Sequence, residues 1–243
     1  MLRAVLFDLD DTLFDHRLCA RTALSELHAA HAQFESYPLD DFERLHSIYL
    51  EELHPLVIRG EIPLEEARRE RLRRLFRAVG VAPAEDLIAQ AAAAYRESYI
   101  RFRKPIPGAA ALLAAVKARA RVAIVSNNLL EEQQDKLRQC SLSNYVDVLV
   151  VSEEAGMSKP DPRIFEIALE RLGCGPDEVV MVGDSWPADI VGAIATGIRP
   201  IWFNPLRLPR PEPDVQVDEI HALAPIDEVM RVIFAGEVVR EKG

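Results

Sequence analysis

Apolar and polar positions follow two different rhythms along this chain. Residues 2–8 form a short apolar run that ends in acidic residues, a pattern typical of a buried strand. From about 16 to 103 there is no convincing strand, and Ala, Leu, Glu and Arg recur at helical spacing between breaks at Pro38, Gly60, Gly80 and Pro83. This stretch predicts four helices, near 17–34, 40–53, 63–78 and 84–102.

After residues 104–108 (KPIPG), helical segments alternate with Val- and Ile-rich runs. This alternation is typical of βαβ units and predicts an α/β fold with a doubly wound parallel sheet covered on both faces. Residues 204–214 are rich in proline and predict an extended loop. The expected helices are 109–119, 130–139, 161–172 and 187–196, and the expected strands are 121–125, 146–151, 178–182 and 198–203.

The helical stretch interrupts the α/β pattern directly after its first strand. We therefore expect an α/β core built from residues 1–15 and 105–243, and an inserted helical domain at 16–104. An insertion at this point lies at the carboxyl ends of the strands, where open α/β sheets bind ligands. The helical domain is thus predicted to be a cap over the site.

Composition narrows the class of protein. A net charge of −10 argues against binding to nucleic-acid polymers and to anionic membranes, and 49% hydrophobic residues argue against disorder. Three scattered cysteines indicate reduced thiols rather than disulfides or a zinc site. The N-terminal apolar run is too short for a signal peptide, and no stretch has the length of a membrane span. We expect a soluble cytoplasmic protein.

Polar side chains gather where the predicted strands end. They are Asp8 and Asp10, then the 126–128 segment (SNN), then Lys159 before Pro160, and finally Asp184 in a 183–185 segment (GDS), followed by Asp189. Carboxylates, a small hydroxyl and a lysine brought to one sheet edge suit phosphoryl transfer onto a carboxylate. Such chemistry needs a nucleophile, a divalent cation and donors for the phosphate oxygens.

These four segments resemble, in this order, the four motifs of the haloacid dehalogenase (HAD) superfamily. The matches are DLDDT at 8–12, SNN at 126–128, SKPDPRIF at 158–165 and GDSWPADI at 183–190. The resemblance covers essentially the whole chain, including a helical cap after the first motif. Within the phosphatase branch, the chain looks most like nucleotidase-like and acylneuraminate-phosphatase-like members.

The resemblance implies three catalytic residues. Asp8 would attack phosphorus and form an aspartyl-phosphate. Asp10 would protonate the leaving oxygen and then activate water. Lys159 would neutralise both the nucleophile and the phosphoryl group.

The resemblance also implies binding residues. Ser126 and Asn127 would hold phosphate oxygens together with Lys159. Asp184 would bind Mg²⁺ with Asp8 and the backbone carbonyl of Asp10, and Asp189 would bind the metal through water or orient Lys159. Carboxylate, carbonyl, phosphate and water oxygens are the usual Mg²⁺ ligands.

The implied function is Mg²⁺-dependent hydrolysis of a small phosphorylated metabolite, a nucleoside monophosphate or a sugar phosphate, by a monomer or homodimer. Two enzymes on the same fold are alternatives. Haloacid dehalogenases lack an acid at the place of Asp10, whereas phosphomutases keep it. A non-enzymatic phospho-aspartate signalling or binding protein is a further alternative. A signalling receiver is expected to be a short domain without a cap insert, with its phosphorylated Asp on an interior strand, whereas Asp8 follows the first strand of the chain.

The predicted third helix carries arginines at 68, 69, 71, 73, 74 and 77. They span too many turns to share one face. One interpretation is a solvated face paired with Glu65, Glu66 and Glu70. The other is that one or two of these arginines guide an anionic substrate.

Overall fold

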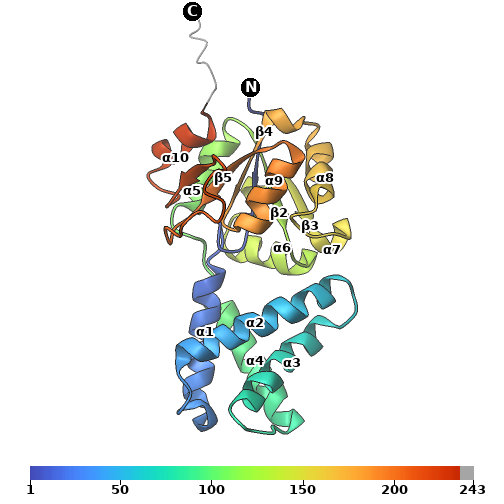
Figure 1. Ribbon diagram of the computed structural model, residues 1–243, viewed down its shortest axis with the longest axis vertical. Coiled ribbons are helices and arrows are strands. Elements are labelled where there is room, and N and C mark those ends of the chain that lie inside the picture. The colour runs from blue at the N-terminus through green and yellow to red at the C-terminus, as the bar shows by residue number, and fades with distance from the viewer. Residues whose placement is uncertain (236–243) are drawn as a thin grey trace, which may run out of the picture. The chain divides into compact units, whose positions relative to one another are not determined.

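The computed structural model describes residues 1–235, and the chain divides into two units (Figure 1). One unit contains residues 1–15 and the chain from Lys104 onward, and the other contains His16–Arg103. Residues 236–243 of the predicted core lie outside the described residues. The role of the second unit as a cap stays a prediction.

The first unit is built on a six-stranded parallel sheet with strand order β3-β2-β1-β4-β5-β6. The chain reverses its direction of winding between β1 and β4, which are neighbours, and such a switch point is where doubly wound sheets bind ligands. The predicted doubly wound α/β fold is confirmed. The strands are β1 (Ala4–Phe7), β2 (Arg121–Ser126), β3 (Val148–Val151), β4 (Val179–Gly183), β5 (Arg199–Phe203) and β6 (Asp218–Ile220).

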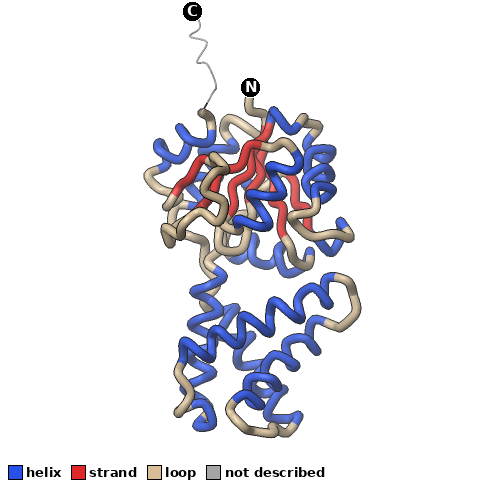
Figure 2. The backbone as a smooth tube through the Cα atoms, in the orientation of Figure 1, coloured by secondary structure: helices blue, strands red, loops and turns tan. Residues whose placement is uncertain are grey.

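Helices cover both faces of this sheet (Figure 2). Alternate strand residues such as Leu6, Val125 and Met181 pack on Ile164 and Phe165 of α8, because successive side chains of a strand point to opposite faces. On the other face α5 packs against β2, and α10 packs against α5. The helices are α5 (Ala109–Lys117), α6 (Leu130–Gln139), α7 (Ser152–Ala155), α8 (Pro162–Leu172), α9 (Val191–Thr196) and α10 (Ile226–Ile233), with a π-helical turn η4 (Trp186–Ile190) before α9.

The second unit consists of helices and is described here by itself. Three aromatic rings form part of its core, because Phe34 lies 4.6 Å from Phe42 and 4.6 Å from Phe76 between ring centroids. Helix α1 packs on α4, and α2 packs on α3. The helices are α1 (His16–Ala30), α2 (Leu39–Ile58), α3 (Leu64–Ala78) and α4 (Glu85–Arg101), with a short 3₁₀ turn η1 (Ala32–Phe34) after α1.

Several predicted boundaries are wrong for identifiable reasons. The helix expected at 40–53 continues to Ile58 through Pro55, because Leu53 and Val57 extend its buried stripe. The helix expected at 17–34 ends at Ala30, and the strand expected at 146–151 begins at Val148 after a 3₁₀ turn. Besides short 3₁₀ turns, the described residues contain two α-helices and one strand that the hydrophobic pattern did not predict, namely α7, α10 and β6.

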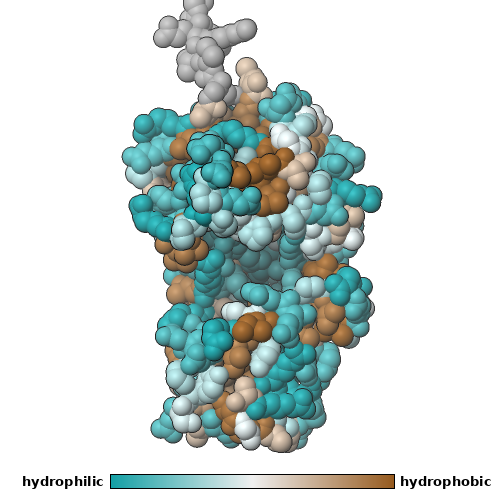
Figure 3. Space-filling model, in the orientation of Figure 1, coloured by the Kyte–Doolittle hydropathy of each residue, from teal (hydrophilic) through white to brown (hydrophobic). Residues whose placement is uncertain are grey.

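The surface is mostly hydrophilic in the view of Figure 3, with an apolar patch over α9. Val191 and Ile194 of this helix are 37% and 46% exposed. Among residues 1–235, no helix combines the length and the apolar character needed to cross a bilayer.

Candidate active site

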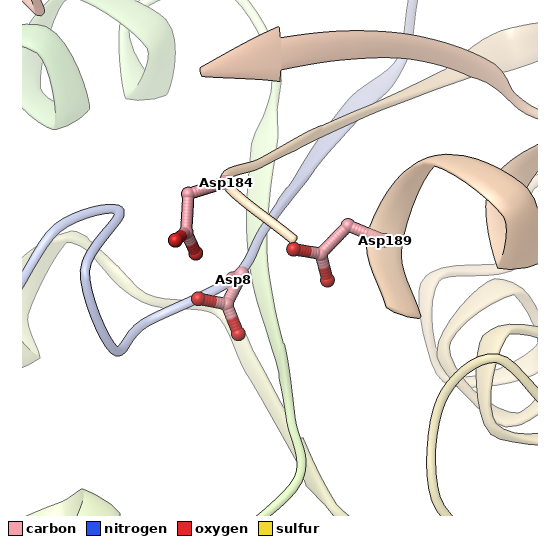
Figure 4. Close-up of side chains that lie close together, drawn as sticks. All are labelled: Asp8, Asp184 and Asp189. Carbon is pink, nitrogen blue, oxygen red and sulfur yellow. The ribbon is translucent and has the colours of Figure 1, made fainter. Parts of the chain in front are cut away.

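Two carboxylates meet where β1 and β4 end. Asp8 follows β1, and its backbone N–H donates to Val182 of β4 at 2.9 Å. Asp184 follows β4 directly, so the pairing of these parallel strands brings both carboxylates to one edge. Figure 4 shows Asp8, Asp184 and Asp189 pointing toward one another. One oxygen from each lies within 4.8 Å of the others.

Lys159 is the cation of this cluster. Its Nζ donates to Asp8 Oδ1 at 2.7 Å, to Asp189 Oδ1 at 2.6 Å and to the carbonyl of Val125 at 2.7 Å. The side chain is almost fully buried, as are both carboxylates. All three donor positions of the ammonium are therefore used within the site.

Asp189 is held close to the backbone by the turn that follows β4. Its Oδ2 accepts from the backbone N–H of Ser185 at 3.0 Å while Oδ1 accepts from Lys159. A Cβ atom at Gly183 would lie 2.3 Å from Asp189 Oδ2, so any side chain there would displace the carboxylate. This close approach explains why glycine stands before Asp184.

Asp10 lies two residues beyond Asp8, but it contacts a different set of groups. Its Oδ1 accepts from Lys136 Nζ at 2.5 Å, and its Oδ2 accepts from Gln133 at 2.8 Å and from Asn128 at 3.2 Å. Gln133 and Lys136 are three residues apart on α6, so both point to the same side of the helix. Both side chains are buried, although they are polar.

Sequence reasoning missed Gln133, Lys136 and Thr12. The signal for Gln133 was present, because it occupies the same helical stripe as Leu130 and Leu137, where an amphipathic helix normally carries an apolar side chain. Thr12 is fully buried and pairs with Asp184 twice. Its Oγ1 accepts from the backbone N–H of Asp184 at 3.1 Å and donates to Asp184 Oδ1 at 3.4 Å.

The side chains of Ser126 and Asn127 have partners inside the protein. The Asn127 amide pairs with the backbone of Lys159 in both directions, at 2.7 and 2.9 Å. Ser126 Oγ accepts from Gln133 at 2.5 Å. The structure thus places Ser126 and Asn127 at the end of β2, and it shows Asn127 fixing the loop backbone from which Lys159 projects.

Electrostatics in this cluster oppose negative charge. Burial raises the pKa of Asp8 well above its usual range, and Asp189 and Asp184 raise it further, whereas Lys159 acts in the opposite direction. Burial works against the charged form of Lys159, but Asp189 and Asp8 outweigh it and raise the pKa of this lysine. Three carboxylates therefore face one ammonium.

This donor set fits a divalent cation. Carboxylate oxygens are the ligands that hard cations prefer, and the cluster holds two more negative than positive charges. Both oxygens of Asp189 accept hydrogen bonds, one from Lys159 and one from the backbone of Ser185.

The chain is similar to a family of hydrolases and to several characterised proteins. The sequence pattern of haloacid dehalogenase-like hydrolases matches residues 2–197. The pyrimidine 5'-nucleotidase YjjG of Escherichia coli is 40% identical over 124 residues, which span 49% of this chain and only 55% of that protein. The glyceraldehyde 3-phosphate phosphatase of Methanothermobacter thermautotrophicus is 32% identical over 221 residues, 84% of this chain and 86% of the relative.

Two solved structures show the same architecture. The HAD-hydrolase YfnB of Bacillus subtilis, crystallised with magnesium, is 25% identical with a TM-score of 0.74, covering 96% of this chain and 99% of that chain. The 2-haloacid dehalogenase of Pseudomonas syringae is 26% identical with a TM-score of 0.64, covering 95% and 98%. Since the family pattern spans most of the sequence, this chain belongs to the haloacid dehalogenase-like hydrolase family.

Proposed function

We propose that this chain is a Mg²⁺-dependent phosphatase that hydrolyses a small phosphorylated metabolite through an aspartyl-phosphate. One observation carries the proposal. A buried carboxylate, Asp8, lies against Lys159 and two further carboxylates, while a second acid two residues later, Asp10, is held apart on its own donors. This arrangement separates a nucleophile from an acid–base group on one short turn.

In the first step, an Asp8 oxygen forms a bond to phosphorus, and the bond between phosphorus and the leaving oxygen breaks. Asp10 gives its proton to that leaving oxygen. In the second step, Asp10 takes a proton from water, the water oxygen bonds to phosphorus, and the bond between phosphorus and Asp8 breaks. Inorganic phosphate leaves, and both carboxyl groups return to their starting states.

Other residues of the site bind and orient. Lys159 stabilises charge on Asp8 and on the phosphoryl oxygens, and Asp189 and Asn127 fix its ammonium and its backbone. Asp8 and Asp184 would hold Mg²⁺, with the backbone carbonyl of Asp10 as a further ligand. When bound, the cation supplies charge neutralisation for phosphate oxygens and for the acidic cluster.

Ser126 is the proposed donor to a phosphate oxygen. In the structure its hydroxyl accepts from Gln133, so its own hydrogen remains available to another acceptor. Asn127 is proposed to support phosphate binding by placing Lys159, because its side-chain amide is used on that backbone.

The names of the relatives support a small phosphate ester as substrate. A nucleotidase and a glyceraldehyde phosphate phosphatase are both similar to this chain, so a nucleoside monophosphate and a sugar phosphate are the two proposed substrate classes. Because one solved structure similar to this chain is a dehalogenase, dehalogenation stays an alternative to be tested. Asp10 and its donors Lys136, Gln133 and Asn128 have no use in a metal-free dehalogenation.

The test is phosphate release from an aryl phosphate and from a panel of nucleotides and sugar phosphates, with Mg²⁺ and with EDTA. We expect release that requires Mg²⁺ and that Asp8→Asn abolishes. Activity that survives either change contradicts the mechanism. Halide release without metal would indicate a dehalogenase, a requirement for a sugar bisphosphate would indicate a mutase, and a long-lived phospho-aspartate would indicate a signalling protein.

A further inference from the structure

The segment after β2 contains a chain of hydrogen bonds that begins at the backbone. The N–H group of Leu129, the residue before α6, donates to Asn128 Oδ1 at 2.9 Å. The amide nitrogen of the same side chain, Nδ2, donates to Asp10 Oδ2 at 3.2 Å. Because a backbone N–H can only donate, this contact fixes the orientation of the Asn128 amide and makes Asp10 Oδ2 an acceptor.

Asp10 passes this direction on to Gln133. Lys136 Nζ, which can only donate, contacts Asp10 Oδ1 at 2.5 Å, and Gln133 Nε2 contacts Oδ2 at 2.8 Å. The same order of donors is possible when Asp10 holds a proton, because a carboxylic acid keeps acceptor capacity. A reversed Gln133 amide would instead place Oε1 against an oxygen that already accepts from Asn128. The amide orientation of Gln133 is therefore fixed as well.

Gln133 donates from one nitrogen to two functional groups. Its Nε2 carries two hydrogens, one for Asp10 Oδ2 and one for Ser126 Oγ at 2.5 Å. The side chain is fully buried, and its Oε1 has no hydrogen-bond partner within residues 1–235. Burying a carbonyl without a partner destabilises a fold, and an amphipathic helix normally has an apolar side chain at such a position. The two contacts of Nε2 account for a glutamine here.

The contact with Gln133 sets the direction of the Ser126 hydroxyl. Its oxygen accepts from Nε2, so its own hydrogen points elsewhere. Ser126 is buried, and its contacts in the described part of the chain include no acceptor for that hydrogen. Buried hydroxyls normally have an acceptor. A phosphate oxygen bound at the end of β2 would supply one.

Gln133 lies behind these two groups and away from any ligand. Its exposed fraction is 0%, whereas the side chain of Asp10 is 26% exposed. A ligand in the site can contact the exposed part of Asp10, but Gln133 offers it no surface. Gln133 would therefore act through the groups that it contacts.

We propose that Gln133 is a positioning residue that links the acid–base group Asp10 to the phosphate donor Ser126, and that its amide directs the Ser126 hydrogen toward a phosphate oxygen of the substrate. This inference rests on the proposed phosphatase function. A donor that is already oriented needs no reorganisation when charge develops on the phosphoryl group. Loss of Gln133 should have two separable effects, because it releases the Ser126 hydroxyl and takes one donor from Asp10.

Three variants on α6 separate positioning from packing. Gln133→Met removes both hydrogen bonds and keeps an unbranched side chain of similar length. Gln133→Glu keeps the shape, but its carboxylate would accept the Ser126 hydrogen and turn it away from the phosphate. Gln134→Met is the matched control, because Gln134 is the next residue of the helix and is exposed.

The link to Ser126 is tested by calorimetric titration of the full-length protein with inorganic phosphate in the presence of Mg²⁺. We expect Gln133→Met to weaken phosphate binding about 3- to 10-fold and Gln133→Glu to weaken it more, whereas Gln134→Met should bind like wild type. In a Ser126→Ala background, Gln133→Met should change the Kd less than about twofold, because the hydroxyl that it directs is absent. Equal losses in both backgrounds, or no loss in either, overturn this link.

The link to Asp10 is tested by kcat/KM, which reports the step that breaks the ester bond. The leaving oxygen of a sugar phosphate needs a proton from Asp10 more than the leaving oxygen of nitrophenyl phosphate does. We therefore expect Gln133→Met to lose about 10- to 100-fold on the sugar phosphate that wild type hydrolyses fastest and at least about threefold less on nitrophenyl phosphate. Weaker phosphate binding would affect both esters alike. Equal losses on the two esters overturn the link to Asp10.

Failure of the proposed function gives a different result. If wild type binds phosphate but hydrolyses no ester, the phosphatase proposal fails, and the calorimetric experiment still decides whether Gln133 acts through Ser126. If wild type binds no phosphate, the link to Ser126 is overturned. If circular dichroism shows that Gln133→Met does not fold, Gln133→Glu provides the same comparisons.

Discussion

Replacing Asp8 with asparagine should inactivate the enzyme and yet stabilise its metal-free form. Asp8→Asn keeps the shape of the side chain, and the amide oxygen can still accept from Lys159. What changes is one negative charge in a buried cluster that contains three carboxylates and one ammonium. The sign of the effect depends on which interactions of that charge dominate.

The distances allow the attraction and the repulsion that act on the Asp8 charge to be compared. At an effective dielectric constant of about 20, the attraction between Asp8 and Lys159 at 2.7 Å is about 6 kcal/mol. Repulsion from Asp184 and Asp189 is about 3.5 kcal/mol each or more, because their oxygens lie within 4.8 Å. The two contributions nearly cancel, so the desolvation of the buried carboxylate determines the outcome. Burial is also the main reason why the pKa of Asp8 is raised.

We therefore expect Asp8→Asn to increase the free energy of unfolding in EDTA by about 1–3 kcal/mol, a rise of about 3–8 °C in Tm. With Mg²⁺ at about 100 times its Kd, wild type should gain about 2.7 kcal/mol. The variant should gain much less, because a neutral amide replaces a charged carboxylate ligand. In Mg²⁺, wild type should then be as stable as Asp8→Asn or more stable.

Tryptophan fluorescence is a suitable signal for this measurement. Both tryptophans of the chain, Trp186 and Trp202, lie in the α/β unit, and Trp202 donates to the Asp184 carbonyl at 2.9 Å. Asp177→Asn, an exposed acid of the same unit, is the matched control and should change neither stability nor the Mg²⁺ response. A variant less stable than wild type in EDTA, or one stabilised equally by Mg²⁺, would refute this reasoning.

Three further predictions concern other buried cations and the pH dependence of stability. Lys136→Met should lower kcat about 10- to 100-fold in steady-state kinetics with little change in KM, because Asp10 loses its positioning partner. Lys136→Arg should restore part of the rate, and an equal loss in the Arg variant would contradict this role. Lys159→Met should lower the free energy of unfolding in EDTA by about 3–5 kcal/mol, measured by urea titration, since two buried carboxylates lose their cation; unchanged stability would count against this. Burial holds the folded-state pKa of His46 below its ordinary 6.5, so the unfolded chain binds more protons than the folded chain as the pH falls below 6.5. The free energy of unfolding should therefore decrease there by up to about 1.4 kcal/mol per pH unit. His46→Phe should reduce this slope, and an unchanged slope would refute the assignment.

The meeting of the candidate carboxylates could be predicted from the sequence because strand ends converge in a parallel sheet. Asp8 and Asp184 are 176 positions apart, yet both follow buried apolar runs, and the pairing of β1 with β4 brings them together. Strand topology thus carried the prediction, and no knowledge of side-chain packing was needed.

The partners of Asp10 could not be predicted in the same way. Gln133 lies on the stripe of Leu130 and Leu137 in α6, so its burial could be predicted, but its pairing with Asp10 could not. For Lys136, only packing shows that this charged side chain faces inward. Strand β6 could not be predicted for a related reason. It is an edge strand of three residues, two of them acidic, and so short a segment has no hydrophobic periodicity.

The turn after β1 gives two aspartates opposite environments within three residues. Asp11 adopts a left-handed conformation with φ 64°, and the chain folds back so that Leu13 and Phe14 donate to the Leu9 carbonyl. As a result, Asp8 lies in a surplus of negative charge, whereas Asp10 lies against Lys136 and two amide donors. Enzymes that use two carboxyl groups in different roles separate them by environment in this way. In the proposed mechanism, the nucleophile Asp8 depends on a cation for its charge balance, but the acid–base group Asp10 does not. Removal of Mg²⁺ should therefore perturb Asp8 and leave the hydrogen bonds of Asp10 in place.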